Sequence, residues 1–249
     1  MKALAITVDV DGEAGLPDGG RGFEERLSSR SERVYGLRRG LPRILGVLEE
    51  FEARATFYVP GVTAARHQDE IAALAAAGHE LGHHGFSHRR PDTLSATEQR
   101  EEIARGLEAL GARPLGYRAP GWELTPATLA LLTEHGFAYD SSLMGDDRPY
   151  ALSNGLIELP VHWSLDDAPY FAASPGGVGL WEVWRAELAL AAAEERPLTL
   201  TLHPDILGRG HRVDVLRRVL AFAADLELAI VTHGELAAAT RSRREAPRA

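Results

Sequence analysis

The sequence contains no cysteine, which excludes disulfide bonds and thiolate metal ligands. Any metal site in this chain must therefore be built from histidine and carboxylate side chains. A chain that needs no disulfide also suits a reducing compartment.

The chain also lacks an excess of positive charge and a long apolar run. Its 36 acidic residues outnumber its 27 basic residues, which gives a formal net charge of −9, and such a field repels nucleic acids and anionic membranes. No segment approaches the run of about 20 apolar residues that spans a bilayer. The first apolar run, Met1–Val8, ends at Asp9 without a small-residue cleavage site. We expect a cytoplasmic protein with neither nucleic acid nor membrane as a partner.

The length of 249 residues and the 45% hydrophobic content predict one domain spanning residues 1–249. Strand-like apolar runs alternate with helical patterns, which favours a parallel α/β arrangement of seven or eight units. Strands are expected at residues 4–9, 55–59, 79–83, 116–119, 138–140, 157–159, 198–202 and 229–231. Helices are expected at residues 40–51, 64–76, 96–110, 126–135, 180–195 and 212–224.

Three stretches interrupt this alternation. Residues 13–39 are Gly-rich, charged and longer than an ordinary connection, so we expect a flap over the site or a subunit contact in a homo-oligomer. Residues 141–179 hold one short strand among turn residues, and Trp163 and Tyr170 in this stretch are candidates to wall a substrate pocket. Residues 241–249 are polar and are expected to be a frayed tail.

Four of the ten histidines fall between residues 79 and 88. Imidazole is the commonest protein ligand for transition metals, so this density predicts a metal site. Two pairs have ligand-like spacing, His79 with His83 and His84 with His88. The first pair falls within a predicted strand, whereas His84 and His88 follow its C-terminal end, where α/β folds place their ligands. We therefore take His84 and His88 as the ligands.

Two carboxylates close the first predicted strand. In an extended chain alternate side chains share one face, so Asp9 and Asp11 can point to the same site. One carboxylate and two histidines make three protein ligands with positions left for water and substrate, which is typical of a catalytic metal site.

Two further clusters end predicted strands. In the segment 116–122, Arg118 can hold Asp9 by a charge-assisted bond, and Trp122 after Pro120 offers a flat face for a sugar or heterocycle. In Leu198–Pro204 leucines alternate along a strand that delivers His203 to its tip, a position that suits a general acid.

These motifs resemble the polysaccharide deacetylases with the NodB-homology domain. The resemblance runs in consistent order through Val8–Gly12, His84–His88, Arg118–Trp122 and Leu200–His203. It implies a distorted (β/α) barrel of seven or eight strands, a divalent metal, most often zinc, and amide hydrolysis.

The resemblance also implies a role for each site residue. Asp11, His84 and His88 correspond to the metal ligands, and Asp9 corresponds to the base, with Arg118 as its partner. The acid corresponds to His203, for which Asp140, Asp166 and Asp167 are candidate orienting partners. Pro120, Trp122, Trp163 and Tyr170 are the candidate substrate-binding residues.

The sequence departs from the usual motif at Val10, which separates two aspartates that are commonly adjacent, and at Glu13, which replaces a common proline. Glu13 is therefore the alternative base. The spaced motif, together with Glu158–Pro160 and Trp163–Asp167, looks closer to an intracellular branch that includes allantoinase-like hydrolases of cyclic amides.

The expected function is metal-dependent hydrolysis of a non-peptide amide, with an N-acetylated sugar or a small amide as substrate. Ring opening of a cyclic amide, ureide or imide is the alternative, because both reactions pass through a tetrahedral intermediate. A metal-bearing sugar-binding module without catalysis is the third reading. The presence of both Asp9 and His203 argues against it, since a binder needs neither an acid nor a base.

Overall fold

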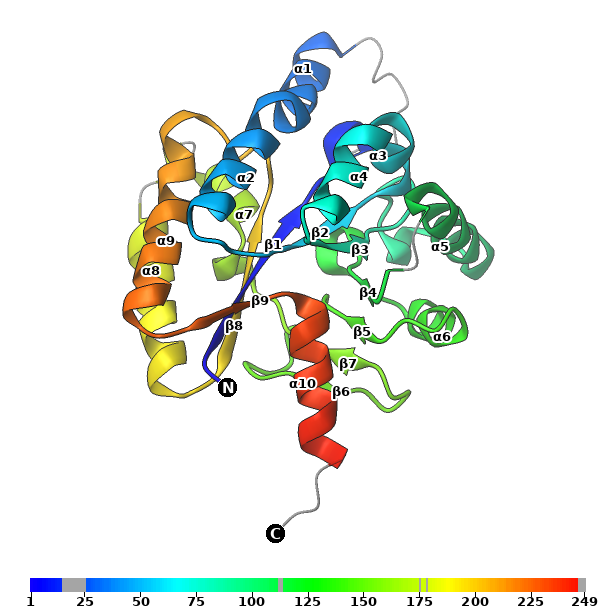
Figure 1. Ribbon diagram of the computed structural model, residues 1–249. Coiled ribbons are helices and arrows are strands. Elements are labelled where there is room, and N and C mark those ends of the chain that lie inside the picture. The colour runs from blue at the N-terminus through cyan, green and yellow to red at the C-terminus, as the bar shows by residue number, and fades with distance from the viewer. Residues whose placement is uncertain (15–25, 112–113, 175, 178, 246–249) are drawn as a thin grey trace.

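The computed structural model describes residues 1–14, 26–111, 114–174, 176–177 and 179–245. In this part of the chain one curled sheet carries most of its helices on its outer side (Figure 1). The strands are β1 (Ala3–Asp9), β2 (Thr56–Val59), β3 (Glu80–His83), β4 (Gly116–Tyr117), β5 (Tyr139–Asp140), β6 (Tyr150–Ala151), β7 (Ile157–Glu158), β8 (Pro197–Leu202) and β9 (Ala229–Val231). The helices are α1 (Leu27–Tyr35), α2 (Leu41–Glu50), α3 (Gly61–Arg66), α4 (Gln68–Ala76), α5 (Ala96–Leu110), α6 (Pro126–Glu134), α7 (Asp167–Ala173), α8 (Leu180–Ala193), α9 (Val213–Asp225) and α10 (His233–Glu245).

The strand order is β6-β7-β5-β4-β3-β2-β1-β8, with β9 paired to the first half of β1. All these pairs are parallel except β6 with β7. Asp166 forms an isolated parallel bridge to Thr201 beside β8. The carboxyl ends of the parallel strands consequently meet at one end of the curled sheet. The expected α/β fold of the distorted-barrel type is confirmed, and the sheet forms a curled half-barrel.

Alternation along β1 separates the two faces of the sheet. Leu4, Ile6 and Val8 are fully buried in the main core cluster, which also holds residues of α2, α8 and α9. Each such aliphatic side chain contributes roughly 1.5–3 kcal/mol on burial. Ala5 faces the other way and packs with Tyr58 and α10 in a smaller cluster. The inward face of β1 is therefore the one that can carry polar groups to the site.

Residues 64–76 do not form the single helix expected from the sequence. The chain leaves the helical region at His67, where φ is −128° and ψ is 47°, and α3 and α4 lie on either side. The His67 Nε2 atom lies 2.9 Å from Glu13 Oε2. The break thus places an imidazole against a carboxylate that follows the Asp9–Asp11 motif.

The expectation of a long loop at residues 13–39 is wrong for most of its described part, while residues 15–25 lie outside the description. Residues 27–40 form α1 and a π-helical turn that continues into α2. Gly36 and Gly40 let this turn approach the chain at Pro204 and Asp205, because a side chain on Gly40 would overlap the Pro204 carbonyl. Arg33 Nη1 also contacts Asp205 Oδ2 at 2.8 Å. The segment therefore supports the loop that follows β8, and a role as a flap or a subunit contact stays a prediction.

Two other regions also hold more structure than expected. Residues 141–179 contain the β6–β7 hairpin and helix α7 instead of one short strand. The expected tail at 241–249 is helical as far as Glu245, and Arg241 Nη2 donates to the Ala138 carbonyl at 3.1 Å. Residues 246–249 lie outside the description. None of the helices in the described ranges is long and apolar enough to cross a membrane.

Helix α5 begins with a capping box at Ser95. The Glu98 backbone N–H donates to Ser95 Oγ at 3.3 Å, and the Ser95 backbone N–H donates to Glu98 Oε2 at 2.8 Å. Ser95→Ala should lower the free energy of unfolding by about 1 kcal/mol, measured by urea denaturation. The exposed Thr97→Ala variant in the same turn is the control. An equal loss in both variants would contradict the capping role.

Candidate active site

The end of β1 brings two carboxylates to the inward face of the sheet. Val10 points outward into the main core cluster and is buried, so Asp9 and Asp11 on either side of it both face inward. Both are almost fully buried. The extra residue between the aspartates is thus accommodated by the alternation of an extended chain, and both carboxylates reach the same site.

The loop after β3 presents His84 and His88. Gly85 and His88 have positive φ values of 71° and 60°, which turn the chain tightly back on itself. Glu102 of α5 holds this loop, because its Oε2 accepts the backbone N–H groups of Phe86 and Ser87 at 2.9 and 2.7 Å. Sequence reasoning missed Glu102, since nothing in a helical repeat marks the carboxylate that faces a loop.

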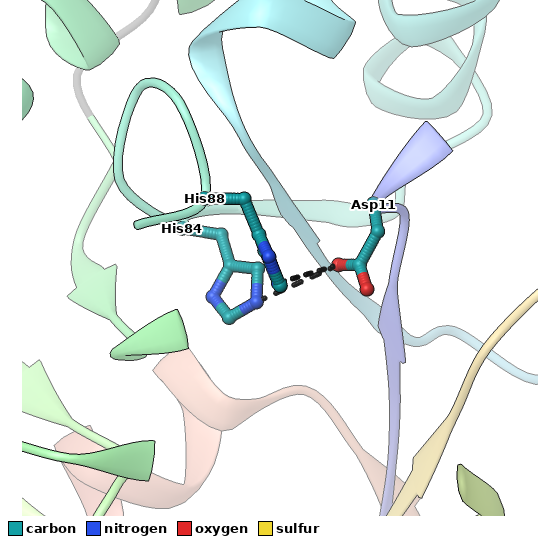
Figure 2. Close-up of side chains that lie close together, drawn as sticks. All are labelled: Asp11, His84 and His88. Carbon is teal, nitrogen blue, oxygen red and sulfur yellow. Dashed lines mark ion pairs between the residues drawn. The ribbon is translucent and has the colours of Figure 1, made fainter. Parts of the chain in front are cut away.

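Asp11, His84 and His88 converge on one point (Figure 2). Their candidate ligand atoms all lie within 4.8 Å of one another. Asp11 Oδ1 is 3.6 Å from His84 Nε2 and 3.3 Å from His88 Nε2. This oxygen is buried without a hydrogen-bond partner in the described part of the chain. A cation would satisfy it, so these three residues fit a divalent metal.

The protonation states suit metal binding. Burial lowers the pKa of His84 to about 4, which leaves its imidazole neutral at pH 7. Its Nδ1 atom lies 2.8 Å from the Arg118 carbonyl, which fixes this nitrogen as the donor and leaves Nε2 free for a metal. Burial opposes ionisation of Asp11, but the neighbouring imidazoles of His88, His203 and His84 lower its pKa well below the usual range.

The alternative histidine pair is engaged elsewhere. His83 is fully buried, with Nε2 at 3.0 Å from the Ile103 carbonyl and Nδ1 accepting from the Gly85 backbone at 3.1 Å. His79 Nδ1 accepts from the Ala55 backbone at 3.2 Å. The structure therefore brings His84 and His88 to Asp11 and leaves the first pair in packing and strand contacts.

Arg118 is fully buried and holds Asp9 in place. Its Nη1 donates to Asp9 Oδ1 at 2.7 Å and to Thr7 Oγ1 at 2.8 Å. The second Asp9 oxygen, Oδ2, lies 3.8 Å from His84 Nε2. One oxygen is thus tied to the guanidinium while the other faces the metal cluster. Glu13, the alternative base, is instead paired with His67.

His203 stands at the tip of β8 on the other side of the cluster. Its Nε2 lies 3.9 Å from Asp11 Oδ2. Asp167 Oδ1 lies 2.7 Å from His203 Nδ1, and Asp167 Oδ2 accepts the His203 backbone N–H at 2.9 Å. Of the three aspartates left open by the sequence, Asp167 is the one that orients His203. Asp166 Oδ1 is farther from His203 Nδ1, at 3.6 Å, and Asp140 lies on β5.

The surroundings of His203 favour its protonated form. Burial opposes the charged imidazole, but the carboxylates of Asp166 and Asp167 raise the pKa of His203 well above its ordinary value. Burial also raises the pKa of Asp166 to about 7. We assign the negative charge beside the imidazolium to Asp167, because it makes both hydrogen bonds to His203. The pair can therefore deliver a proton near neutral pH.

The two carboxylates and three histidines open into a cleft of about 320 Å³. Its wall is largely apolar, with the rings of Trp122 and Trp163 in contact at a centroid distance of 4.4 Å and tilted by 34°. Trp163 remains 48% exposed. The described residues that line the cleft are Asp9, Asp11, His84, His88, Gly121, Trp122, Trp163, Asp166, Ala168, Pro169, Ala172 and His203.

Two of the expected substrate-binding residues are not among those lining residues. Tyr170 lies on α7 but packs against the main core cluster, whereas Ala168, Pro169 and Ala172 of the same helix reach the cleft. Pro120 is buried beside Gly85. The sequence analysis indicated the right segment but selected its aromatic residue, which is partly buried against the main core cluster.

We expect the protein to bind one divalent ion per chain through Asp11, His84 and His88. His84→Ala removes a ligand and should weaken metal binding by more than about 100-fold. Mutation of a residue that only hydrogen-bonds to a ligand already weakens metal binding by up to about 100-fold. Elemental analysis and a chelator competition measure this. His79→Ala, outside the cluster, is the matched control and should keep its metal. Full occupancy in His84→Ala, or loss of metal in His79→Ala, would contradict the assignment.

Comparison with known proteins agrees with this geometry. A family model described as polysaccharide deacetylase matches residues 34–139. The peptidoglycan deacetylase of Helicobacter pylori is 28% identical over 248 residues, which cover 83% of this chain and 84% of that protein. The chain is thus also similar to a curated deacetylase over most of its length.

Two solved structures are similar over almost the whole chain. One from Mycobacterium smegmatis, assigned to the polysaccharide deacetylases, is 39% identical with a TM-score of 0.89 and covers 99% of this chain and 92% of that chain. The PuuE allantoinase is 25% identical with a TM-score of 0.86, and the match covers 98% of this chain and 92% of that chain. The resemblance inferred from the motifs is confirmed: the chain belongs to the polysaccharide deacetylase family of hydrolases.

Proposed function

We propose that this hydrolase removes the acetyl group from an N-acetylated sugar, with a divalent metal, most often zinc in this setting, at Asp11, His84 and His88. The observation that carries the proposal is the position of Asp9 and His203 on two sides of one metal cluster in a single cleft. Hydrolysis of an amide needs both a base for the attacking water and an acid for the departing nitrogen.

The roles follow from which atoms are free. Asp9 Oδ2 faces the cluster and takes the proton of the attacking water, while Oδ1 stays on Arg118. A divalent metal at the three ligands would supply Lewis-acid polarisation of the amide carbonyl. His203 Nε2 points to the same cleft and gives its proton to the nitrogen, while Nδ1 stays on Asp167. The products are acetate and a free amine.

The cleft wall favours a sugar. A pyranose ring has apolar C–H faces that pack on aromatic rings, and the half-exposed Trp163 offers such a face beside the catalytic groups. The curated relatives described as peptidoglycan, chitin and chitooligosaccharide deacetylases support the same substrate class. Ring opening of a cyclic ureide is the second candidate, and the likeness to an allantoinase supports it.

The substrate class can be decided by turnover. The zinc-loaded protein should release acetate from oligomers of N-acetylglucosamine and should leave allantoin intact. Acetate is measured enzymatically and allantoin by its ring-opened product. Turnover of allantoin without turnover of the sugars would replace the proposal by the second candidate.

The separation of acid and base predicts similar losses for Asp9→Asn and His203→Ala. Each variant should lower kcat by about 10² to 10⁴-fold, the usual contribution of one positioned acid or base, and should keep its metal. Steady-state kinetics with parallel metal analysis measure both effects. Near-normal kcat in metal-loaded Asp9→Asn would overturn the assignment of the base.

Asp167 should set the alkaline limit of activity. In wild type the rate falls when His203 loses its proton, at a pH well above 6.5, because Asp167 and Asp166 raise the pKa of His203. Asp167→Asn removes a negative charge, so the alkaline limb should move to lower pH and kcat should fall by about 10²-fold. Profiles of kcat/KM against pH measure the shift, with the exposed Asp225→Asn as control. An unmoved alkaline limb would show that another group sets it.

A further inference from the structure

Two buried carboxyl groups lie next to the site but outside the chemistry described above. Asp140 ends β5 and Glu158 ends β7, and the two are paired in register on these adjacent strands. Both are fully buried. Neither is among the described residues that line the cleft. Buried acidic groups are costly unless they are satisfied, so this pair requires a physical explanation.

Each carboxyl group has one oxygen engaged and one without a partner. Glu158 Oε1 accepts the backbone N–H groups of Ser142 and Leu143, both at 3.0 Å. Asp140 Oδ1 accepts from Ser142 Oγ at 3.0 Å. In the described part of the chain Asp140 Oδ2 and Glu158 Oε2 have no hydrogen-bond donor. One proton between these two oxygens would satisfy both.

The electrostatics agree with a single proton on this pair. Burial and the charge of Asp140 raise the pKa of Glu158 to about 10, while burial raises the pKa of Asp140 to about 6. At pH 7 Glu158 is therefore the protonated donor and Asp140 the ionised acceptor. Arg118 is the cation that acts on Asp140. The phenols of Tyr117 on β4 and Tyr150 on β6 are near this pair. Burial and the neighbouring carboxylates raise their pKa values, so both stay neutral.

The pair is connected to the catalytic base through the turn at Ser141 and Ser142. Arg118 Nε donates to the Ser141 carbonyl at 3.1 Å, and Nη2 donates to Ser141 Oγ at 3.0 Å. Ser142 Oγ in turn accepts the Ala119 backbone N–H at 2.9 Å. These bonds fix two of the three guanidinium nitrogens, and the third, Nη1, points at Asp9.

We propose that Asp140 and Glu158 share one proton and act as a positioning pair, which clamps the Ser141–Ser142 turn so that Arg118 holds Asp9 in its productive orientation. The shared proton lets the pair accept three hydrogen bonds from the turn while placing only one negative charge beside Arg118. The catalytic part of this proposal rests on the proposed role of Asp9, whereas the shared proton does not.

The shared proton is tested without substrate. Infrared difference spectra of wild type against Glu158→Gln at pH 7 should show loss of a protonated-carboxyl band, and the subtraction removes other protonated acids such as Asp166. Persistence of the full band in Glu158→Gln would overturn the shared proton.

The dependence of stability on pH gives a second test without substrate. Folded Glu158 keeps its proton up to a pKa of about 10, whereas an unfolded glutamate loses it near about 4.3. Its stabilising contribution is therefore present at low pH and is lost as the pH rises towards 10. The urea midpoint of wild type should fall relative to Glu158→Gln between pH 5 and pH 9. Parallel midpoints would overturn the proton assignment.

The positioning role is tested by kinetics. The amide in Glu158→Gln can donate to Asp140 and accept from the turn, so this variant should keep kcat within about threefold. Glu158→Ala removes the hydrogen bonds that hold the turn. It should lower kcat by about 10²-fold with little change in KM, as expected when a catalytic group is misplaced. Leu216→Ala, a buried substitution in α9, controls for lost stability and should keep kcat at temperatures where it is folded. If Glu158→Ala does not fold, Ser142→Ala takes its place, with the same expected loss.

The outcomes separate the two proposals. Unchanged kcat in a folded Glu158→Ala or Ser142→Ala variant would overturn the positioning role, and so would an equal loss in Glu158→Gln and Glu158→Ala. If the sugars are not substrates, the infrared and urea results still decide the shared proton, so failure of the proposed function is distinguishable from failure of this inference.

Discussion

The site depends on one buried ion pair, Arg118 with Asp9. A buried guanidinium is expensive to desolvate, and it is tolerated only when its hydrogen-bonding capacity is met. Here Thr7, Asp9 and Ser141 accept from it on every side. Because these partners come from β1 and from the turn after β5, the pair joins opposite parts of the curled sheet. Removing either charge would leave the other buried without its partner.

The catalytic and metal-binding side chains lie at strand ends, where the sheet holds them in fixed positions. β1 supplies Asp9 and Asp11, the loop after β3 supplies His84 and His88, and β8 supplies His203, each from a segment fixed by its neighbours in the sheet. The carbonyl of Arg118 also orients His84 at 2.8 Å. The base and one candidate metal ligand are therefore held by the same residue. A rigid scaffold of this kind keeps the reacting groups in register.

Much of this arrangement was predictable from sequence, for identifiable reasons. The strand tips with Asp9, His84 and His203 carry local signals, because polar residues follow apolar runs. The partner of His203 was not predictable, since three aspartates were equivalent until folding placed Asp167 on its ring. Helix α10 could have been found from its capping box, in which Thr232 and Glu235 bond to each other's backbone N–H. The packing of Tyr170 depends on long-range contacts that no local pattern records.

The position of β1 has a consequence for how the chain is made. β1 precedes the other described strands in the chain, yet it pairs with β8 near residue 200 and with β9 near residue 230. Such pairings are distant in sequence and form slowly. During synthesis one edge of this apolar strand therefore stays unpaired until β8 and β9 have been made, and an unpaired apolar edge is prone to aggregation. The strand that organises the catalytic groups can therefore pair with β2 early, along one edge, but completes its other edge only when segments about 190 residues further along the chain have been made.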